Sequence, residues 1–276
     1  MNFYKMHGLG NDFVIVEAAA WKAADAFQSM AELICDRHIG VGADGLVVVG
    51  REGEQDWFMR IFNPDGSEAE MCGNAIRCIA RLAWEQRWIS QPQMSVRTLG
   101  GIKYPEVLGV DTGSLRVRVD MGEPVLERAV IPMRGEGQAV NIGLQTAAGE
   151  FMITAVSMGN PHCVVRVEDM TNVPVHEWGP LLERNDMFPA KTNVEFIEVL
   201  STRELRMRVW ERGAGMTMAC GTGACASLVA AVLNGYSERA ASVMLDGGEL
   251  FIEWMEADGH VYMTGPAELV FTGTWG

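Results

Sequence analysis

The sequence predicts an α/β fold of the α+β kind, made of two pseudo-symmetric domains that each wrap a curved sheet or barrel around a central helix. Two observations lead to this prediction. Short motifs of the first half recur in the second half at nearly constant spacing, and each half joins strand-like runs to a Cys-Gly element that opens an apolar stretch. We expect the two Cys-Gly elements to face each other, which puts the active site in the cleft between the domains.

The internal repeat consists of four short matches in the same order along the chain. Residues 71–75 (MCGNA) resemble residues 219–223 (ACGTG), which places Cys220 148 residues after Cys72. The other matches are Asn11 with Asn160 at 149 residues, Asp44 with Asn193 at 149, and Asn63 with Glu211 at 148. Each match alone is weak, but four at nearly one offset indicate a duplicated unit.

Strands are predicted from two kinds of pattern. Short apolar runs rich in β-branched residues predict strands at 13–16, 46–49 and 164–165, and alternation of apolar with polar residues predicts half-buried strands at 115–120 and 205–210. The hinge between the two halves is expected near residues 121–124.

A predicted helix follows each Cys-Gly element. Residues 224–233 are apolar all round apart from Ser227, so this helix must be buried on nearly all sides. Residues 75–84 are similar and are relieved only by Arg77 and Arg81, which lie one turn apart on one stripe. Both helices are therefore predicted to be the centres of their domains.

Composition limits the classes of function. The chain has 276 residues, 48% hydrophobic and 21% charged, with a net charge of −14. This charge and the lack of a basic run argue against a nucleic-acid partner and against a membrane surface. No apolar stretch reaches the ~20 residues of a membrane helix, and the first residues lack the apolar centre of a secretion signal. We expect a cytoplasmic protein that acts on a small molecule.

The six cysteines are not expected to form disulfides, because the chain is large and carries no export signal. No Cys-x-x-Cys pair occurs, and no metal site is predicted. Free cysteines are by default buried small apolar residues, and this is the prediction for Cys35, Cys78, Cys163 and Cys225.

Cys72 and Cys220 occupy positions that favour chemistry. A cysteine at a helix N-terminus sits among unpaired backbone N–H groups and the positive end of the helix dipole, which is expected to lower its pKa. The glycine after each lets a ligand approach the backbone, and Asn74 and Thr222 add donors for a carboxylate.

Two such cysteines suit the inversion of an α-carbon. Inversion needs a base on one face of the carbon and an acid on the other, and a thiolate and a thiol can exchange these roles without a cofactor. Donors around the carboxylate stabilise the charge that develops as the α-proton leaves. The alternative is that both cysteines are packing residues that begin buried helices; their equivalent placement in a duplication argues against it.

At these motifs the chain resembles the diaminopimelate epimerases over nearly its whole length, from residues 7–13 (HGLGNDF) to residues 263–266 (MTGP). The motifs between them are 62–66 (FNPDG), 71–74 (MCGN), 158–162 (MGNPH), 192–193 (TN), 210–213 (WERG) and 219–224 (ACGTGA). Proline racemases share little beyond the Cys-Gly elements.

The resemblance implies a role for each candidate residue. Cys72 and Cys220 would be the acid/base pair, and His162 and Glu211 would assist their proton handling. The reacting carboxylate would be held by Gly73, Asn74, Gly221 and Thr222. The distal amino acid end would be recognised by Asn11, Asn63, Asn160, Asn193, Glu211 and Arg212. This lining is chemically apt, because an arginine grips a carboxylate bidentately, a glutamate accepts an ammonium, and asparagines supply donors and acceptors.

The resemblance also implies an overall organisation. The domains would comprise residues 1–121 with 265–276, because the C-terminal strand returns to the first domain, and residues 122–264. The enzyme would interconvert LL- and meso-diaminopimelate for lysine and peptidoglycan precursor synthesis, without pyridoxal phosphate or any other cofactor, as a homodimer.

One departure from the family pattern stands out. The family usually has Glu before the second cysteine, where this chain has Met216, and the duplication aligns Met216 with Glu68. We expect the loss of this carboxylate to remove an acceptor close to Cys220 and to shift the proton balance between the sulfurs. Gly45, where some members carry a polar side chain, is a minor second departure.

Two other functions remain open at this point. One is an amino acid racemase of the same mechanism with another substrate, such as histidine, although such an enzyme has no evident use for Arg212 and four asparagines. The other is a non-catalytic amino acid binding protein, against which both cysteines argue. Under each of these hypotheses, the alternative for each asparagine is that it only forms a turn.

Overall fold

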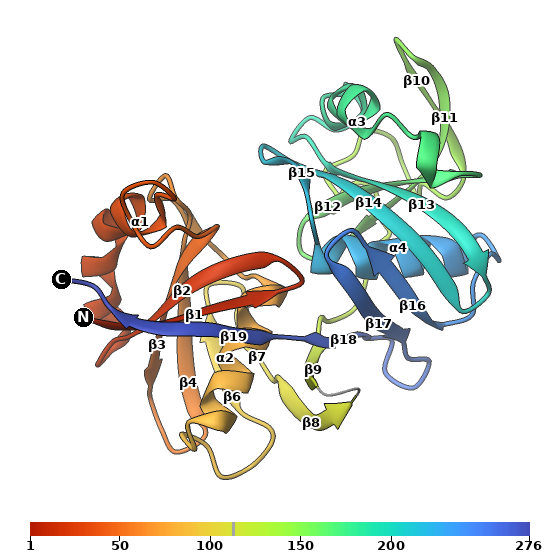
Figure 1. The fold of residues 1–276 in the computed structure, drawn as a ribbon. Helices are drawn as coiled ribbons and strands as arrows, with labels where there is room; N and C mark the ends of the chain where they lie inside the picture. Colours follow the sequence, from red (N-terminus) through yellow and green to blue (C-terminus); the bar gives the residue numbers. More distant parts are fainter. Residues whose placement is uncertain (112–113) are drawn as a thin grey trace. The chain divides into compact units, whose positions relative to one another are not determined.

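A computed structural model describes residues 1–111 and 114–276 of the chain. The chain divides into two compact units, Met1–Asp120 with Thr264–Gly276, and Met121–Met263. Each unit is built mainly of strands with few helices (Figure 1). The mixed α/β class and the two sheet-rich parts that the sequence predicts are confirmed.

The first unit is one sheet with helices. Its sheet follows the order β19-β1-β2-β3-β4-β6-β7, with β5 paired to β4. The elements are β1 (Asn2–Gly8), β2 (Asn11–Glu17), η1 (Trp21–Phe27), α1 (Gln28–Cys35), β3 (Gly45–Arg51), β4 (Asp56–Phe62), β5 (Glu68–Ala69), α2 (Gly73–Glu85), β6 (Ser95–Thr98), β7 (Gly101–Lys103), β8 (Glu106–Asp111), β9 (Ser114–Asp120) and β19 (Glu268–Thr274). Strands β8 and β9 form an antiparallel pair.

The second unit repeats this plan. Its strands follow the order β10-β11-β12-β13-β14-β16-β17-β18, with β15 paired to β14. The elements are β10 (Ile142–Thr146), β11 (Gly149–Ser157), β12 (Pro161–Val167), η2 (Met170–Asn172), α3 (Val175–Glu183), β13 (Asn193–Ser201), β14 (Glu204–Glu211), β15 (Gly215–Thr217), α4 (Gly221–Leu233), β16 (Ala240–Leu245), β17 (Gly248–Trp254) and β18 (Val261–Pro266), whose last residues lie in the first unit.

In each unit, one helix packs against the strands that form the core. Helix α2 contacts β1, β8, β9 and β19, and helix α4 contacts β11 to β14, β16 and β17. The apolar pattern explains this placement, because ten consecutive side chains of α2 include only two arginines and those of α4 only Ser227 as polar groups. Ser227 is fully buried and donates to the Met207 sulfur at 3.1 Å.

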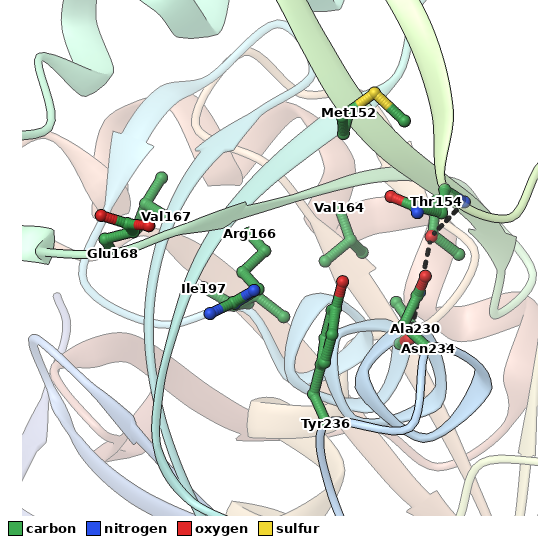
Figure 2. Close-up of a pocket in the computed structure, with 11 residues that line it drawn as sticks. Met152, Thr154, Val164, Arg166, Val167, Glu168, Ile197, Ala230, Asn234 and Tyr236 are labelled. Carbon is green, nitrogen blue, oxygen red and sulfur yellow. Dashed lines mark hydrogen bonds between the residues drawn. The ribbon is translucent and has the colours of Figure 1, made fainter.

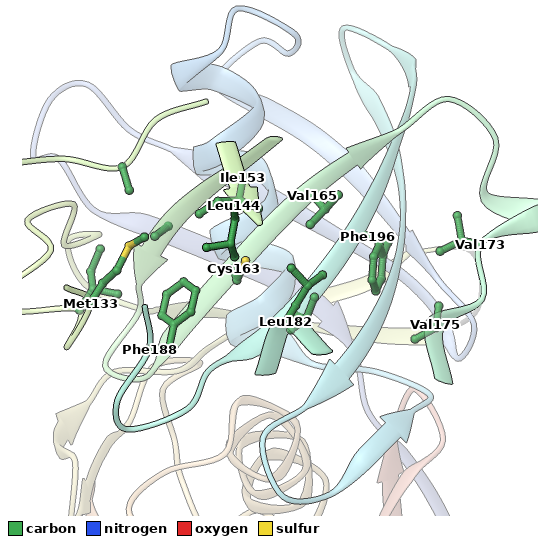
Figure 3. Close-up of a cluster of buried hydrophobic side chains, with 14 of the residues drawn as sticks. Met133, Leu144, Ile153, Cys163, Val165, Val173, Val175, Leu182, Phe188 and Phe196 are labelled. Carbon is green, nitrogen blue, oxygen red and sulfur yellow. The ribbon is translucent and has the colours of Figure 1, made fainter. Parts of the chain in front are cut away.

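A further apolar cluster in the second unit lies on the sheet beneath α3. It includes Leu144, Cys163, Leu182, Phe188 and Phe196 (Figure 3). Cys35, Cys78 and Cys225 are also buried, as the sequence predicts.

The strand registers confirm that the repeat is structural. Leu46 pairs with Phe62 and Phe62 with Glu68 in the first unit; 148 residues later, Val194 pairs with Trp210 and Trp210 with Met216. Helices α2 and α4 both have 13 residues and both begin directly after their cysteine.

One match of the predicted repeat is wrong by a residue. The register of β13 makes Gly45, not Asp44, the counterpart of Asn193, because β3 and β13 are related at 148 residues while Asn11 and Asn160 are related at 149. Successive strand residues point to opposite faces, so Asp44 and Asn193 do not hold equivalent positions.

Candidate active site

Cys72 and Cys220 are the N-caps of α2 and α4. Both have extended backbone angles, with φ of −139° and −127°, and each is followed by the glycine that begins its helix. The first N–H groups of a helix have no intrahelical acceptor and attract an anion. In α4 one of these groups, that of Gly223, donates to the Cys220 sulfur at 3.4 Å.

Around Cys72 the side chains form a connected group. The oxygen Oδ1 of Asn11 accepts from Asn74 Nδ2 at 3.0 Å and from the Cys72 thiol at 3.8 Å. Fully buried Arg77 in turn donates to Asn74 Oδ1 at 2.7 Å and to the carbonyl of Gly73 at 3.0 Å. The structure therefore brings together four predicted residues, Asn11, Cys72, Gly73 and Asn74, and adds Arg77.

An acidic and basic cluster fixes the other side of Asn11. Asn11 Nδ2 donates to Asp44 Oδ2 at 2.9 Å, and Arg37 bridges Asp44 and Asp12 at 2.8 and 2.7 Å. Burial would raise the pKa of Asp12, but hydrogen bonds from Arg37 and Lys5 outweigh it and hold this pKa at about 2. Because an ionised carboxylate only accepts, the Asn11 amide is oriented with its nitrogen towards Asp44.

Asn63 makes its hydrogen bonds within its own turn. Its side chain donates to Ser67 Oγ at 2.9 Å, and its backbone N–H donates to the carbonyl of Ser67 at 2.8 Å. The structure thus gives Asn63 the turn role that the sequence left open as an alternative.

In the second unit, a buried chain of polar side chains lies beside α4. His162 Nδ1 is 2.7 Å from Glu195 Oε1, and His162 Nε2 is 2.9 Å from Asn160 Oδ1. Both His162 and Glu195 are 0% exposed. Sequence reasoning missed Glu195; the sign was a carboxylate within the apolar strand run that follows Asn193.

Glu211 lies on the other side of the same region. Its Oε1 accepts a hydrogen bond from Thr217 Oγ1. Burial raises the pKa of Glu211 and the charge of Glu195 adds to this, while hydrogen bonds from Thr217 and Cys220 lower it. The predicted neighbours His162, Glu211 and Cys220 are therefore close enough to influence each other's charge.

The Cys220 thiol differs from expectation. Its pKa is raised well above the ordinary 9.0, first by burial and then by the charges of Glu211 and Glu195; hydrogen bonds from Thr222 and Gly223 lower it only in part. The expectation that the helix N-terminus lowers this pKa is wrong, because the effect of one helix end is smaller than that of burial beside two carboxylates.

The side chain of Asn193 is hydrogen-bonded to the backbone of Arg212. Asn193 is nearly buried; its Oδ1 accepts from the Arg212 N–H and its Nδ2 donates to the Pro161 carbonyl, both at 2.9 Å. The Arg212 guanidinium is bonded at 3.3 Å to the Ala190 carbonyl. Asn193 thereby positions the backbone of Arg212. Thr222 Oγ1 lies 3.5 Å from the Cys220 sulfur and follows Gly221, the first residue of α4.

Met216 is 57% exposed on β15, opposite Trp210. Its counterpart Glu68 makes two hydrogen bonds, of 2.6 and 2.8 Å, to Arg60. The counterpart of Arg60 is Arg208, which pairs with Asp246 at 3.2 Å instead. The first unit therefore indicates that a carboxylate at position 216 would pair with an arginine.

No cluster of His, Cys, Asp and Glu within residues 1–111 and 114–276 has the arrangement of a metal site. A pocket of about 240 Å³ in the second unit, lined by residues such as Thr154, Arg166, Asn234 and Tyr236, contains none of the predicted site residues (Figure 2). Across the part of the chain that is described, no helix has the length and apolarity that a membrane crossing requires.

Comparison with known proteins finds relatives that match nearly the whole chain. A family model described as Diaminopimelate epimerase matches residues 3–127 and 154–270. The diaminopimelate epimerase of Pelotomaculum thermopropionicum is 56% identical over 278 residues, covering 100% of this chain and 99% of that protein.

Solved structures of more distant proteins share the fold. A PhzF-family phenazine biosynthesis protein of Bacillus anthracis is 16% identical with a TM-score of 0.71, covering 99% of this chain and 98% of that one. A probable proline racemase of Agrobacterium radiobacter is 14% identical with a TM-score of 0.71, covering 100% of this chain and 92% of that one.

Proposed function

Because the chain belongs to the diaminopimelate epimerase family and is therefore an isomerase, we propose that it interconverts LL- and meso-diaminopimelate by two-base proton transfer. The reaction would supply lysine and peptidoglycan precursors in the cytoplasm. The observation that carries the mechanism is the equivalent placement of Cys72 and Cys220 as N-caps of two repeated helices.

In this mechanism one sulfur removes the α-proton as a thiolate and the other delivers its thiol proton to the opposite face of the α-carbon. The C–H electron pair stays on the carbon as a carbanion until the second proton arrives, so one bond to hydrogen breaks and one forms. The enzyme then holds its single proton on the other sulfur. The raised pKa of Cys220 supports Cys220 as the thiol of the free enzyme, and the mechanism then requires Cys72 to act as the base.

The carboxylate of the reacting centre would be held at the two helix N-termini, by Gly73 and Asn74 and by Gly221 and Thr222. Backbone donors there stabilise the charge of the carbanion in place of a cofactor. This arrangement requires both helix ends to meet one substrate, and that placement of the two units is part of the proposal.

The distal amino acid end would be recognised by Asn11, Asn63, Asn160, Asn193, Glu211 and Arg212. Their hydrogen bonds suggest a division of work. Asn63 and Asn193 use their amides on the protein itself and position their loops, whereas Asn11 and Asn160 each have one amide group engaged by a neighbouring charge network. His162 and Glu211 would tune the proton affinity of Cys220.

The test is turnover of LL-diaminopimelate in deuterated water by reduced protein without metal or pyridoxal phosphate. We expect meso product with deuterium at the α-carbon. Cys72→Ala and Cys220→Ala should each abolish it while the circular dichroism spectrum is kept. Exchange with histidine but not with diaminopimelate would instead support the racemase of another amino acid, and turnover by either alanine variant would overturn the two-cysteine mechanism.

We also propose a homodimer through the edge strand β19. This strand ends the path of its sheet, and its side chains Val270 and Phe271 are 55% and 46% exposed. An exposed apolar edge strand is a natural pairing surface. Light scattering should give twice the chain mass, and Phe271→Glu should shift the protein towards the monomer; a monomeric wild type would contradict the proposal.

A further inference from the structure

The buried carboxylate of Glu195 enters the mechanism above only through its charge, which contributes to the raised pKa of Cys220. It lies on β13, with Oε1 at 2.7 Å from His162 Nδ1. A Cβ on Gly223 would lie 2.7 Å from this Oε1 and 3.2 Å from the Cys220 sulfur, so the carboxylate and the sulfur meet at the first turn of α4. Among the described residues, Glu195 Oε2 has no hydrogen-bond partner although it is buried. A carboxylate is costly to bury in this way, which indicates a function.

The ring of His162 lies between two oxygens. An ionised Glu195 only accepts, so Nδ1 carries a hydrogen, and Nε2 satisfies Asn160 Oδ1 only if it also carries one. With Glu195 ionised and the Asn160 oxygen facing the ring, both ring nitrogens of His162 act as donors. The other ionisable groups that interact with this pair are Glu211 on β14, which interacts with both His162 and Glu195, and two thiols that interact with Glu195, those of Cys220 at α4 and Cys163 on β12.

The protonation of the ring decides which group Asn160 offers to a ligand. With its Oδ1 bound by the His162 N–H, the amide nitrogen of Asn160 is left as the donor. Asn11, its counterpart in the repeat, is held the opposite way: its nitrogen donates to Asp44, and its oxygen accepts from Asn74 and Cys72. Two equivalent asparagines are thus fixed in opposite orientations, one by an acceptor and the other by a donor.

We propose that Glu195 is a positioning residue for substrate recognition, which keeps His162 protonated on both ring nitrogens and thereby presents the Asn160 amide N–H groups to an anionic oxygen of the substrate. The inference rests on the proposed function in that Asn160 lines the substrate site. Without the Glu195 charge the ring becomes neutral, Nε2 becomes an acceptor, the amide of Asn160 turns, and its oxygen opposes the substrate carboxylate.

The test compares Glu195→Gln with Glu198→Gln, the same change on the same strand at a partly exposed carboxylate that pairs with Arg206. Glutamine has the shape of glutamate, so the change removes chiefly the charge. We expect the KM for LL-diaminopimelate to rise about tenfold in Glu195→Gln with a smaller change in kcat, and both constants to stay within about twofold of wild type in Glu198→Gln. Equal KM values in the two variants would overturn the inference.

A second readout needs no substrate. In protein labelled with nitrogen-15 histidine, the His162 signals are assigned by their loss in His162→Gln. We expect two protonated ring nitrogens in the wild type at pH 7.5 and one in Glu195→Gln. A singly protonated ring in the wild type overturns the inference even if Glu195→Gln fails to fold. A doubly protonated ring in a protein that does not turn over diaminopimelate would count against the proposed function and not against the Glu195–His162 pair.

Discussion

Replacing Glu211 with glutamine is expected to lower the pKa of the Cys220 thiol. Burial raises this pKa most, and the charge of Glu211 is the next contribution, ahead of that of Glu195. Glu211 also takes a hydrogen bond from the thiol, which favours the protonated sulfur. Glutamine keeps the size of the side chain but not its charge, so the thiolate loses its nearest repulsion and becomes easier to form.

The magnitude follows from Coulomb's law. Two unit charges at roughly 4 Å interact by about 4 kcal/mol at an effective dielectric constant near 20, which corresponds to an upper limit of about 3 pKa units. Part of this is lost because the pKa of Glu211 is itself raised and because the glutamine oxygen can still accept from the thiol. We therefore expect the pKa of Cys220 to fall by about 1–2 units, or about 1.4–2.7 kcal/mol.

The assay measures the rate of alkylation of Cys220 by iodoacetamide against pH. It uses a Cys72→Ala background and locates the adduct by fragment mass spectrometry, because Cys225 lies close in sequence. The inflection of the rate should move to lower pH in Glu211→Gln and stay in place in Glu198→Gln, whose carboxylate pairs with Arg206 on the same sheet. An inflection that stays fixed or moves up in Glu211→Gln would refute the assignment of Glu211 as a neighbour that keeps Cys220 protonated.

Three further changes test other parts of the structure. Met216→Glu should leave the Cys220 alkylation inflection in place and alter the free energy of unfolding by less than about 1 kcal/mol, because the new carboxylate reaches Arg208 at the surface; a moved inflection, or a larger change in guanidinium unfolding, would argue otherwise. In urea unfolding, Asp12→Asn should destabilise the protein by about 1–2 kcal/mol at pH 7 and by little near pH 2. The ionised Asp12, with its pKa lowered to about 2, contributes stability that is present above the unfolded pKa of about 3.9 and is lost as the pH falls through 2. An equal loss of stability at both pH values would show that the charge does not matter. Gly223→Ala should destabilise by about 1–3 kcal/mol in thermal unfolding and reduce kcat, because its Cβ would come within 2.7 Å of Glu195; an unaffected variant would show that this carboxylate can move aside.

The sequence allowed the repeated fold to be predicted because the repeat preserves its landmarks. The offset between Cys72 and Cys220 also relates the helix lengths and the antiparallel registers. The sequence alone did not allow the match of Asp44 with Asn193 to be tested, because a shift of one residue between adjacent strands leaves no trace in short motifs. Only the register of β13 shows that Gly45 is the true counterpart.

The errors at the site have a common physical origin. A helix N-terminus is visible in sequence, so the caps Cys72 and Cys220 were found, but burial is a property of the assembled unit and it decides the pKa of Cys220. Glu195 was missed for the same reason. In a run of apolar strand residues a single carboxylate has no visible partner, and its partner His162 comes from another strand, 33 residues away.

The duplication also explains why the two cysteines are chemically unequal on equal scaffolds. Arg77, fully buried in the first turns of α2, corresponds to Cys225 in α4, and Glu195 beside α4 corresponds to Val47 on β3. A cation therefore lies near the N-terminus of α2, and carboxylates lie near the N-terminus of α4. A nearby cation favours the thiolate and nearby carboxylates favour the thiol. In the proposed mechanism, the differences at these two positions of the repeat would therefore divide one proton unequally between Cys72 and Cys220. The ratio of the two kcat/KM values is fixed by the equilibrium constant of the reaction, so this inequality cannot favour one stereoisomer overall. What it sets is the pH range in which one sulfur is charged and the other is not.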